Sequence, residues 1–397
     1  MDILTDENKI DEVVKRGVEK NYPSDDFLRE KLKEGKQLKI YLGIDPTGPT
    51  LHMGHMVVLK KLRQLQLLGH KIVLLIGDFT ATIGDPDKTS VREPLTREEV
   101  LENQQLYKEQ ASIFLDFGGE NPAEFVYNSE WLSKMNFEEV LNLASKMTVQ
   151  QMLERDMFKR RLEEGKPIYI HEFMYPLMVA QDSLVMDVDG EVGGNDQTFN
   201  MLTGRHLQKE VQNKEKFVIP MKLLVDSTGA KMGKTTGNML SFLDSADEKF
   251  GKIMSWTDGM ILPGFELLTD KDLKEVEERL RSSENPRDIK MDLALTIVEF
   301  YHSKNEAEEA QKNWEAQFSK NEIPENIEEF EVKEGEGILT ILSQIGFVTS
   351  NGEARRKVAE KAVKLDGEAV LDPTYTITGS GEKIIKLGRK IAKLIIK

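Results

Sequence analysis

Two histidines stand three positions apart where a strand-like run gives way to a helical pattern. They are His52 and His55, with Gly54 between them. At this spacing both imidazoles lie on one turn of a helix, whose N-terminus offers unpaired N–H groups and partial positive charge to an anion. An imidazole N–H can also donate to a phosphate oxygen. The pattern predicts a nucleotide phosphate site without a Walker lysine, although histidines that merely cap or pack the helix are the alternative.

A second basic stretch lies far downstream, where residues 229–238 read Gly-Ala-Lys-Met-Gly-Lys-Thr-Thr-Gly-Asn. Its ammonium groups, on Lys231 and Lys234, could stabilise the negative charge that develops on pyrophosphate when a triphosphate is cleaved. A glycine-rich loop could close on the nucleotide when it binds. The alternative is an ordinary solvated basic loop.

The composition excludes several other kinds of site. The 397 residues include no cysteine and only six histidines, so disulfides, thiolate metal sites and a cysteine nucleophile are ruled out. No third ligand lies at a useful spacing from His52 and His55, and we therefore predict no protein-held metal. No apolar run approaches the roughly 20 residues that cross a bilayer. The cysteine-free chain with an acidic, non-secretory N-terminus indicates the cytoplasm and no membrane partner.

The elements around the first motif alternate between strands and helices. Residues 38–44 form an apolar run, a Pro/Gly turn follows, a helical pattern ends at Gly69, and a second apolar run covers residues 71–77. Later strands are predicted at residues 125–127 and 217–219. This order predicts an α/β fold with a Rossmann-like parallel sheet, and ligands bind beyond the carboxyl ends of such strands. The loop after Ile44 should therefore form the site.

Composition divides the chain into four parts. Residues 1–244 are predicted as the Rossmann-like catalytic domain with an N-terminal helical segment, and residues 245–319 as a helical domain. Residues 320–337 form an acidic, weakly periodic stretch that we predict as a linker. Residues 338–397 form a small α+β module.

The charge is distributed unevenly between these parts. The net charge is −15, but residues 338–397 contain 11 Lys or Arg against 6 Asp or Glu and so carry +5, which leaves −20 on the rest. A basic module on an acidic body indicates a nucleic-acid contact, because phosphate attraction needs only a local patch. An ordinary solvated face is the alternative. Within the module we expect a helix at residues 338–342, a helix capped by Ser350 or Asn351, and a hairpin with an Asp-Gly turn at residues 366–367.

Together the two motifs resemble the signatures of class I aminoacyl-tRNA synthetases. The first reads His-Met-Gly-His at residues 52–55, and the second reads Lys-Met-Gly-Lys-Thr at residues 231–235, where the family commonly has Lys-Met-Ser-Lys-Ser. Further strings resemble bacterial tyrosyl-tRNA synthetases; they cover residues 41–47, 83–86, 175–182 and 193–197. The segment from Ile338 resembles the S4-type RNA-binding domain of those enzymes, so the likeness covers nearly the whole chain.

The resemblance implies a role for each amino-acid-binding residue. Asp85 and Tyr175 would hold the ammonium group of L-tyrosine, Tyr41 and Asp182 would bond its phenolic hydroxyl, and Gln197 would lie beside it. Tyr175 and Asp182 are seven residues apart, which places both on one face of a helix. The chain departs from the family pattern at two positions: a glutamine is replaced by Val179, and the tyrosine before the aspartate is replaced by Gln181.

The resemblance also implies an ATP site, with magnesium bound mainly through the phosphates. Thr47, His52 and His55 would contact phosphates, Asp196 would lie near the ribose, and Lys231 and Lys234 would clamp pyrophosphate. The ATP-binding residues that we predict are Gly43, Asp45, Thr47, His52, Gly54, His55, Asp196, Lys231 and Lys234.

The partner implied for the basic module is tRNA(Tyr), and a homodimer is implied by the same resemblance. The predicted RNA contacts are Arg355, Arg356, Lys361 and Lys364, which would position phosphates rather than read bases. Two other functions stay open from the sequence. One is a tryptophanyl-tRNA synthetase, and the other is an RNA-binding or splicing cofactor descended from a synthetase.

Overall fold

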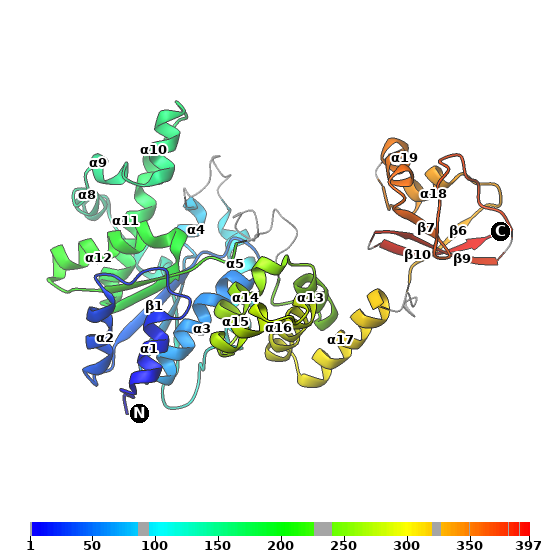
Figure 1. Ribbon diagram of the computed structural model, residues 1–397. Coiled ribbons are helices and arrows are strands. Elements are labelled where there is room, and N and C mark those ends of the chain that lie inside the picture. The colour runs from blue at the N-terminus through cyan, green and yellow to red at the C-terminus, as the bar shows by residue number, and fades with distance from the viewer. Residues whose placement is uncertain are drawn as a thin grey trace. The chain divides into compact units, whose positions relative to one another are not determined.

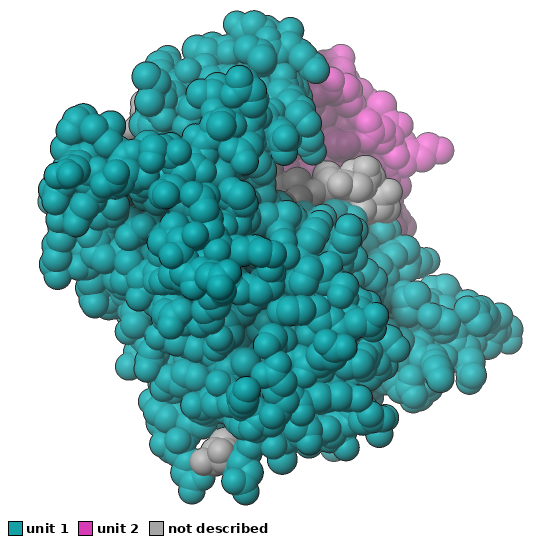
Figure 2. Space-filling view, turned by 90° about the vertical axis from the view of Figure 1, so that its left-hand side faces the viewer, with its two compact units in different colours: residues 1–307 teal, residues 308–397 magenta. Residues whose placement is uncertain are grey.

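The computed structural model describes residues 2–85, 95–225, 240–319, 327–348, 350–379, 381–388 and 390–397. The chain folds as one compact unit of residues 1–307 and a second of residues 308–397, which Figure 2 colours separately. The two units are described in turn.

The first unit is built on five parallel strands in the order β3-β2-β1-β4-β5. Their bounds are β1 Lys39–Ile44, β2 Lys71–Ile76, β3 Glu124–Tyr127, β4 Gly190–Gly194 and β5 Phe217–Met221. The α/β class with a Rossmann-like parallel sheet is confirmed, and each of the four strands predicted from the sequence is present. The strand that sequence reasoning missed is β4, whose Gly-rich sequence has little strand propensity.

The strand order reverses beside β1. Helix α3 (Met53–Leu67) leads from β1 to β2, and α12 (Thr198–Gln212) leads from β4 to β5 in the other direction. Because such crossovers are right-handed, the two helices cover opposite faces of the sheet, as Figure 1 shows. The crevice between the carboxyl ends of β1 and β4 is therefore the topological switch point, where open α/β sheets bind ligands.

Both faces of this sheet are covered, since nearly every residue of β2, β4 and β5 is buried. On one face Tyr41, Val73 and Leu75 pack with Met186 and Val188 in a small apolar cluster. Met186 ends the long helix α11 (Ile170–Met186), which packs along α12. Tyr41 thus points from β1 toward α11.

Short helices lie between the main elements: α4 to α6 connect β2 to β3, and α7 to α10 connect β3 to α11. Their bounds are α4 Thr80–Ile83, α5 Arg97–Asn103, α6 Tyr107–Ala111, α7 Ser129–Leu132, α8 Phe137–Ala144, α9 Val149–Met152 and α10 Asp156–Glu163, with the 3-10 turn η1 Asn195–Gln197 after β4.

Between residues 245 and 319 the chain is helical, and the boundary between the two units at residue 307 falls within the last of these helices. The helices are α13 Ala246–Met254, η3 Asp258–Met260, α14 Ile261–Leu268, α15 Leu273–Arg281, α16 Pro286–Tyr301 and α17 Lys304–Ser319. The sequence predicts residues 245–319 to be helical, and α13 to α17 lie in this range. The division of residues 1–307 into catalytic and helical domains stays a prediction.

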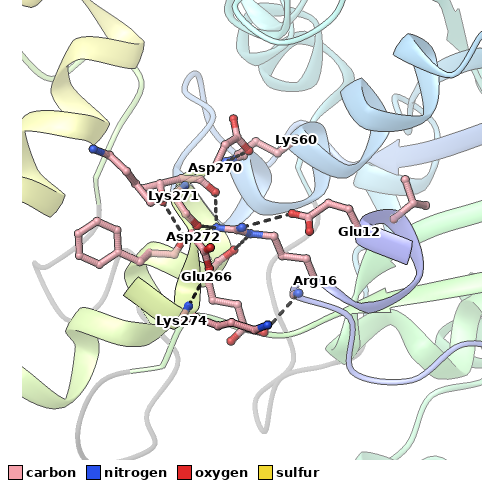
Figure 3. Close-up of polar contacts among 12 residues, drawn as sticks. Glu12, Arg16, Lys60, Glu266, Asp270, Lys271, Asp272 and Lys274 are labelled. Carbon is pink, nitrogen blue, oxygen red and sulfur yellow. Dashed lines mark hydrogen bonds and ion pairs between the residues drawn. The ribbon is translucent and has the colours of Figure 1, made fainter. Parts of the chain in front are cut away.

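Arg16 ties the N-terminal helices to this helical part. It follows α1 (Glu7–Lys15), which packs on α2 (Asp25–Lys33), and it donates to four backbone carbonyls at the end of α14 (Figure 3). The acceptors, at 2.9–3.0 Å, belong to Phe265, Glu266, Thr269 and Lys271. A guanidinium satisfies carbonyls that a helix end leaves unpaired, so one cation fixes α14 against the N-terminal segment.

The second unit has its own mixed sheet in the order β6-β10-β9-β7-β8, and its own apolar core. The strands are β6 Glu329–Val332, β7 Val363–Leu365, β8 Glu368–Ala369, β9 Gly381–Leu387 and β10 Lys390–Ile396, and the helices are α18 Ile338–Gln344 and α19 Asn351–Ala359. As expected, Ser350 caps α19, and residues 366 and 367 turn between β7 and β8 with φ of 50° and 88°. Strand β6 lies inside the stretch predicted as a linker, because pairing with β10 overrides its acidic composition.

Candidate active site

The two histidines cap the helix that leaves the switch point. His52 is the N-cap of α3, and its Nδ1 atom accepts the backbone N–H of Gly54 at 3.1 Å. Nδ1 of His55 accepts the backbone N–H of His52 at 3.1 Å, and the two ring centroids are 4.1 Å apart. In a neutral ring the hydrogen is then on Nε2, the atom that can donate to a phosphate oxygen. Capping and phosphate binding are therefore compatible functions of this pair.

Asp45, directly after β1, joins two elements of the site. Its Oδ1 atom accepts the hydroxyl of Thr80 at 2.7 Å, and its Oδ2 atom accepts the hydroxyl of Tyr175 at 2.9 Å. A side chain at Gly77 would collide with both Asp45 and Thr80, so glycine is required at the end of β2. Asp45 thereby fixes Tyr175 of α11 above the carboxyl ends of β1 and β2.

Asp85 receives donors from two further elements. Nη2 of Arg155 lies 2.6 Å from its Oδ1, and Nε2 of Gln197 lies 2.8 Å from its Oδ2. Asn200 holds Gln197 through a 2.7 Å hydrogen bond. Only 7% of the Arg155 side chain and 13% of the Asp85 side chain are exposed, so this ion pair is shielded from water.

Asp182 is a buried carboxylate with two N–H donors. It accepts the indole N–H of Trp131 at 2.8 Å and the side-chain amide of Asn128 at 3.2 Å. Burial raises the pKa of Asp182 well above its usual range, and the two donors oppose that shift by stabilising the charged form. The two N–H donors hold the carboxyl group of Asp182 in one orientation in an apolar setting.

Tyr41 is fully buried on the neighbouring strand, with its hydroxyl 2.9 Å from the hydroxyl of Ser183. Burial, with the negative charges of Glu191 and Asp182 nearby, raises its pKa well above 10. Burial and the negative charge of Asp45 likewise raise the pKa of Tyr175 well above its usual value. Both phenols consequently keep their hydrogens at neutral pH and can donate hydrogen bonds.

The predicted residues fall into two groups at the switch point. In one group Tyr175 bonds Asp45 and Gln197 bonds Asp85, and in the other the charge of Asp182 acts on Tyr41. Asn128 and Thr80 link Asp182 to Asp45. Thr47 and Asp196 lie in the loops after β1 and β4, where the backbone N–H of Thr47 bonds the carbonyl of Asp45. Gly43 is the exposed position within β1. Lys231 and Lys234 lie outside the described residues.

The two departures from the family pattern have different surroundings. Val179 packs in an apolar cluster with Phe79, Ile83 and Tyr175, so an aliphatic contact stands where the family has an amide. Gln181 points to the other side of α11 and lines a surface groove with Trp131 and Leu207. Arg155, Gln197 and Asn200 supply the polar contacts to Asp85 instead.

Sequence reasoning missed several side chains of this pocket, namely Thr80, Asn128, Trp131, Arg155, Ser183 and Asn200. Arg155 lies in a run of charged residues that reads as a solvated helix start, and the others are isolated polar residues. Ser183 carries the one available signal, since it directly follows Asp182.

The predicted RNA contacts lie on one helix–turn–strand segment of the second unit. Arg355 and Arg356 are exposed on α19, Lys361 is exposed in the turn that follows, and Lys364 is exposed on β7. Buried Ala354 and Val358 hold the other face of α19 on the core.

The arrangement suits binding and alignment more than acid–base chemistry. One group offers carboxylates to a cation, the other offers a phenol and a carboxylate to a hydroxyl group, and the N-terminus of α3 with its two imidazoles follows β1. Convergent polar groups of this kind at a switch point can align an amino acid with a nucleotide.

Comparison with known proteins agrees with these features. A family described as "tRNA synthetases class I (W and Y)" matches residues 33–319. The chain is 44% identical to "Tyrosine--tRNA ligase 2" of Vibrio parahaemolyticus over 97% of the chain and 98% of that protein. It is 42% identical to the tyrosine--tRNA ligase of Thermotoga maritima over 98% of the chain and 97% of that protein. A C-terminally truncated mitochondrial tyrosyl-tRNA synthetase from Coccidioides posadasii has a similar structure, with a TM-score of 0.63, 25% identity and coverage of 77% of this chain and 91% of that one.

Proposed function

The chain belongs to the bacterial tyrosyl-tRNA synthetases, and from this premise we propose which of its residues serve each step of the reaction. The enzyme activates L-tyrosine with ATP to tyrosyl-adenylate and pyrophosphate, and then transfers tyrosine to the 3′-terminal ribose of tRNA(Tyr). In the first step the tyrosine carboxylate attacks the α-phosphorus, and in the second a ribose hydroxyl attacks the activated carbonyl. Alignment and charge stabilisation provide the rate, because neither step needs a nucleophile from the protein.

Tyrosine would lie along α11, with its two ends in the two groups of polar residues. Asp85, Tyr175 and Gln197 would hold the ammonium group, and the hydroxyl groups of Tyr41 and the substrate would meet near Asp182. The observation that carries this assignment is the convergence of Tyr175, Asp45 and Asp85 on one end of the pocket, from α11, the end of β1 and the segment after α4.

ATP would lie across the N-terminus of α3. His52 and His55 would donate to its phosphates, Thr47 and Gly54 would meet them through the backbone, and Gly43 would leave room beside β1. Asp45 and Asp196 would border the nucleotide, Asp196 near the ribose, and Lys231 and Lys234 would meet the pyrophosphate as it leaves.

Magnesium would enter the site with ATP. It would be bound chiefly through phosphate oxygens. The ion would neutralise phosphate charge, while the protein residues align the reacting groups.

The basic second unit would bind the backbone of tRNA(Tyr). Arg355, Arg356, Lys361 and Lys364 present four cations on one exposed segment, and residues 338–397 carry +5. These contacts would orient the tRNA without reading its sequence.

We also propose that the enzyme is a homodimer. Phe137 and Leu141 of α8 and Val149 of α9 are 77%, 55% and 57% exposed, which is costly for a monomer in water. Leu143 of α8 also lines, with Met135, a surface groove of about 480 Å³. A second copy of the chain would cover this surface. Sedimentation equilibrium should give twice the chain mass, and Phe137→Asp should shift it toward the monomer.

The cytoplasm is the proposed compartment, because a cysteine-free chain gains nothing from an oxidising environment. Among the described helices, none is both long and apolar enough to cross a membrane.

Pyrophosphate exchange with each of the twenty amino acids tests the assignment. With ATP and magnesium, L-tyrosine should drive the exchange of labelled pyrophosphate into ATP, and phenylalanine should be far poorer. Exchange driven best by tryptophan would indicate the tryptophanyl enzyme. Absence of exchange with every amino acid would indicate the RNA-binding cofactor instead.

A further inference from the structure

A buried ion pair lies beside Tyr41, with Nζ of Lys216 5.6 Å from the centroid of the phenol ring. Lys216, immediately before β5, has a fully buried side chain, and its ammonium contacts the carboxylate of Glu191 on β4. Removing such a pair from water is costly and does not in general stabilise a fold. An apolar residue would fill the same space without the cost of burying a charge. We therefore expect the pair to have a function other than packing.

The sheet register explains why Glu191 and Tyr41 face each other. They are register partners on the adjacent parallel strands β4 and β1, so their side chains leave the same face of the sheet. The charge of Glu191 is one cause of the raised pKa of Tyr41. An unpaired Glu191 would therefore be a strong acceptor for the hydrogen of the Tyr41 hydroxyl.

Lys216 also determines the hydrogen-bond direction of Ser183. Its Nζ atom lies 2.8 Å from Oγ of Ser183, and because an ammonium can only donate, Ser183 accepts this bond. The hydrogen of Ser183 is then directed at the acceptor within reach, the Tyr41 oxygen at 2.9 Å. With Ser183 donating to its oxygen, Tyr41 has its own O–H left to donate, and the Glu191 carboxylate, with which it has a side-chain hydrogen bond, competes for it with any substrate oxygen.

Helix α12 is adapted to this cluster. A side chain at Gly204 would approach Nζ of Lys216 to 2.7 Å and Oγ of Ser183 to 2.8 Å, closer than any carbon contact allows. A glycine inside a helix is destabilising relative to alanine. Its presence here leaves the space in which Lys216 reaches Ser183.

We propose that Lys216, Glu191 and Ser183 are positioning residues for recognition of the substrate hydroxyl, acting through Tyr41. This inference rests on the proposed tyrosine pocket. A phenolic substrate needs a donor to its oxygen and an acceptor for its hydrogen. Asp182 is the acceptor, and the cluster keeps Tyr41 as the donor because Lys216 neutralises Glu191 and orients Ser183. Phenylalanine, which lacks the hydroxyl, would leave these buried groups unpaired.

The test compares activation of tyrosine and phenylalanine by pyrophosphate exchange. Ser183→Ala should lower kcat/KM for tyrosine about tenfold and leave the value for phenylalanine unchanged. Lys216→Met should lower the ratio of kcat/KM for tyrosine to kcat/KM for phenylalanine further. The double variant Lys216→Met/Glu191→Gln should recover part of this ratio, because the carboxylate that competes for the Tyr41 hydrogen is gone. Thr203→Val is the matched control, since its hydroxyl bonds the carbonyl of Phe199 within α12.

A double-mutant comparison shows whether the effect passes through Tyr41. In the Tyr41→Phe background, Ser183→Ala should change the tyrosine-to-phenylalanine ratio no further. An equal loss of kcat/KM for both amino acids in Ser183→Ala, or a full additional loss in the Tyr41→Phe background, would overturn the inference and leave the cluster structural. If Tyr41→Phe itself leaves the ratio unchanged, the proposed pocket fails, whatever Ser183 does.

Discussion

Arg155 forms a 2.6 Å ion pair with Asp85, the carboxylate proposed for the substrate ammonium. The two residues are 70 positions apart in the chain and nearly buried. Arg155 offsets the charge of Asp85 when the ammonium group is absent, and Gln197 holds the other oxygen. The residue that sequence resemblance assigns to the substrate is thus already oriented by two other side chains.

Replacing Asp85 with asparagine should weaken tyrosine binding by about tenfold to a hundredfold, the effect of losing one charge-assisted hydrogen bond. Equilibrium binding would be measured for tyrosine and for 3-(4-hydroxyphenyl)propionate, which lacks the amino group. The analogue should bind both proteins with similar affinity. Equal weakening for both ligands would mean that Asp85 supports the pocket without meeting the ammonium.

Alanine at Lys231 or Lys234 should slow adenylate formation and leave the dissociation constant of tyrosine nearly unchanged. The reason is that their charge matters most while negative charge moves onto pyrophosphate. Single-turnover measurements of tyrosyl-adenylate formation give the rate constant, and equilibrium binding gives the affinity. A parallel loss of affinity and rate would contradict a transition-state function of the loop.

Removal of the second unit should spare tyrosine activation and strongly reduce tRNA charging. Since β6 belongs to its sheet, the cut should follow Ser319 rather than precede Ile338. The remaining body is strongly acidic, and each lost phosphate contact should reduce the slope of log affinity against log salt by roughly 0.7–0.9. Tyrosine-dependent pyrophosphate exchange is the internal control. Charging at the intact rate with the same salt slope would refute the RNA contacts assigned to Arg355, Arg356, Lys361 and Lys364.

His70 should make the fold less stable as the pH falls from 6.5 toward 4. Burial lowers its pKa from 6.5 to about 4, so the unfolded chain takes up a proton in this interval and the folded chain does not. The neutral ring therefore contributes stability above pH 6.5 that is lost on acidification, at most about 3 kcal/mol. Its Nδ1 accepts the backbone N–H of Leu38 at 3.3 Å, a bond that asparagine could retain.

Urea unfolding at pH 7 and pH 5 would measure this contribution. His70→Asn should show a smaller loss of unfolding free energy between the two pH values than the wild type. His206→Asn, at an exposed position on α12, should behave as the wild type does. If His70→Asn loses as much unfolding free energy between pH 7 and pH 5 as the wild type does, His70 is not the cause of the loss of stability.

The sequence by itself determined the features that depend on local geometry. Apolar runs predicted four of the five strands of the parallel sheet. Spacings of three and seven residues placed His52 with His55 and Tyr175 with Asp182, because helical periodicity fixes which side chains share a face. Resemblance added the enzyme family from motifs that each lie within one short segment of the sequence. Strand β4 was not predicted because its glycines have low strand propensity. Glycine is needed there because neighbouring side chains pack closely against the strand.

Only the tertiary structure decided which distant polar groups meet. The pairs Arg155 with Asp85, and Lys216 with Glu191 and Ser183, depend on strand order, register and the crossing of α11 and α12. No periodicity in the chain encodes such partners, because a hydrogen bond between residues 25 to 70 positions apart requires the intervening elements to be folded. Strand β6 shows the same dependence on distant partners. Its acidic sequence is typical of a linker, but it forms a strand because it pairs with β10, more than 60 residues later.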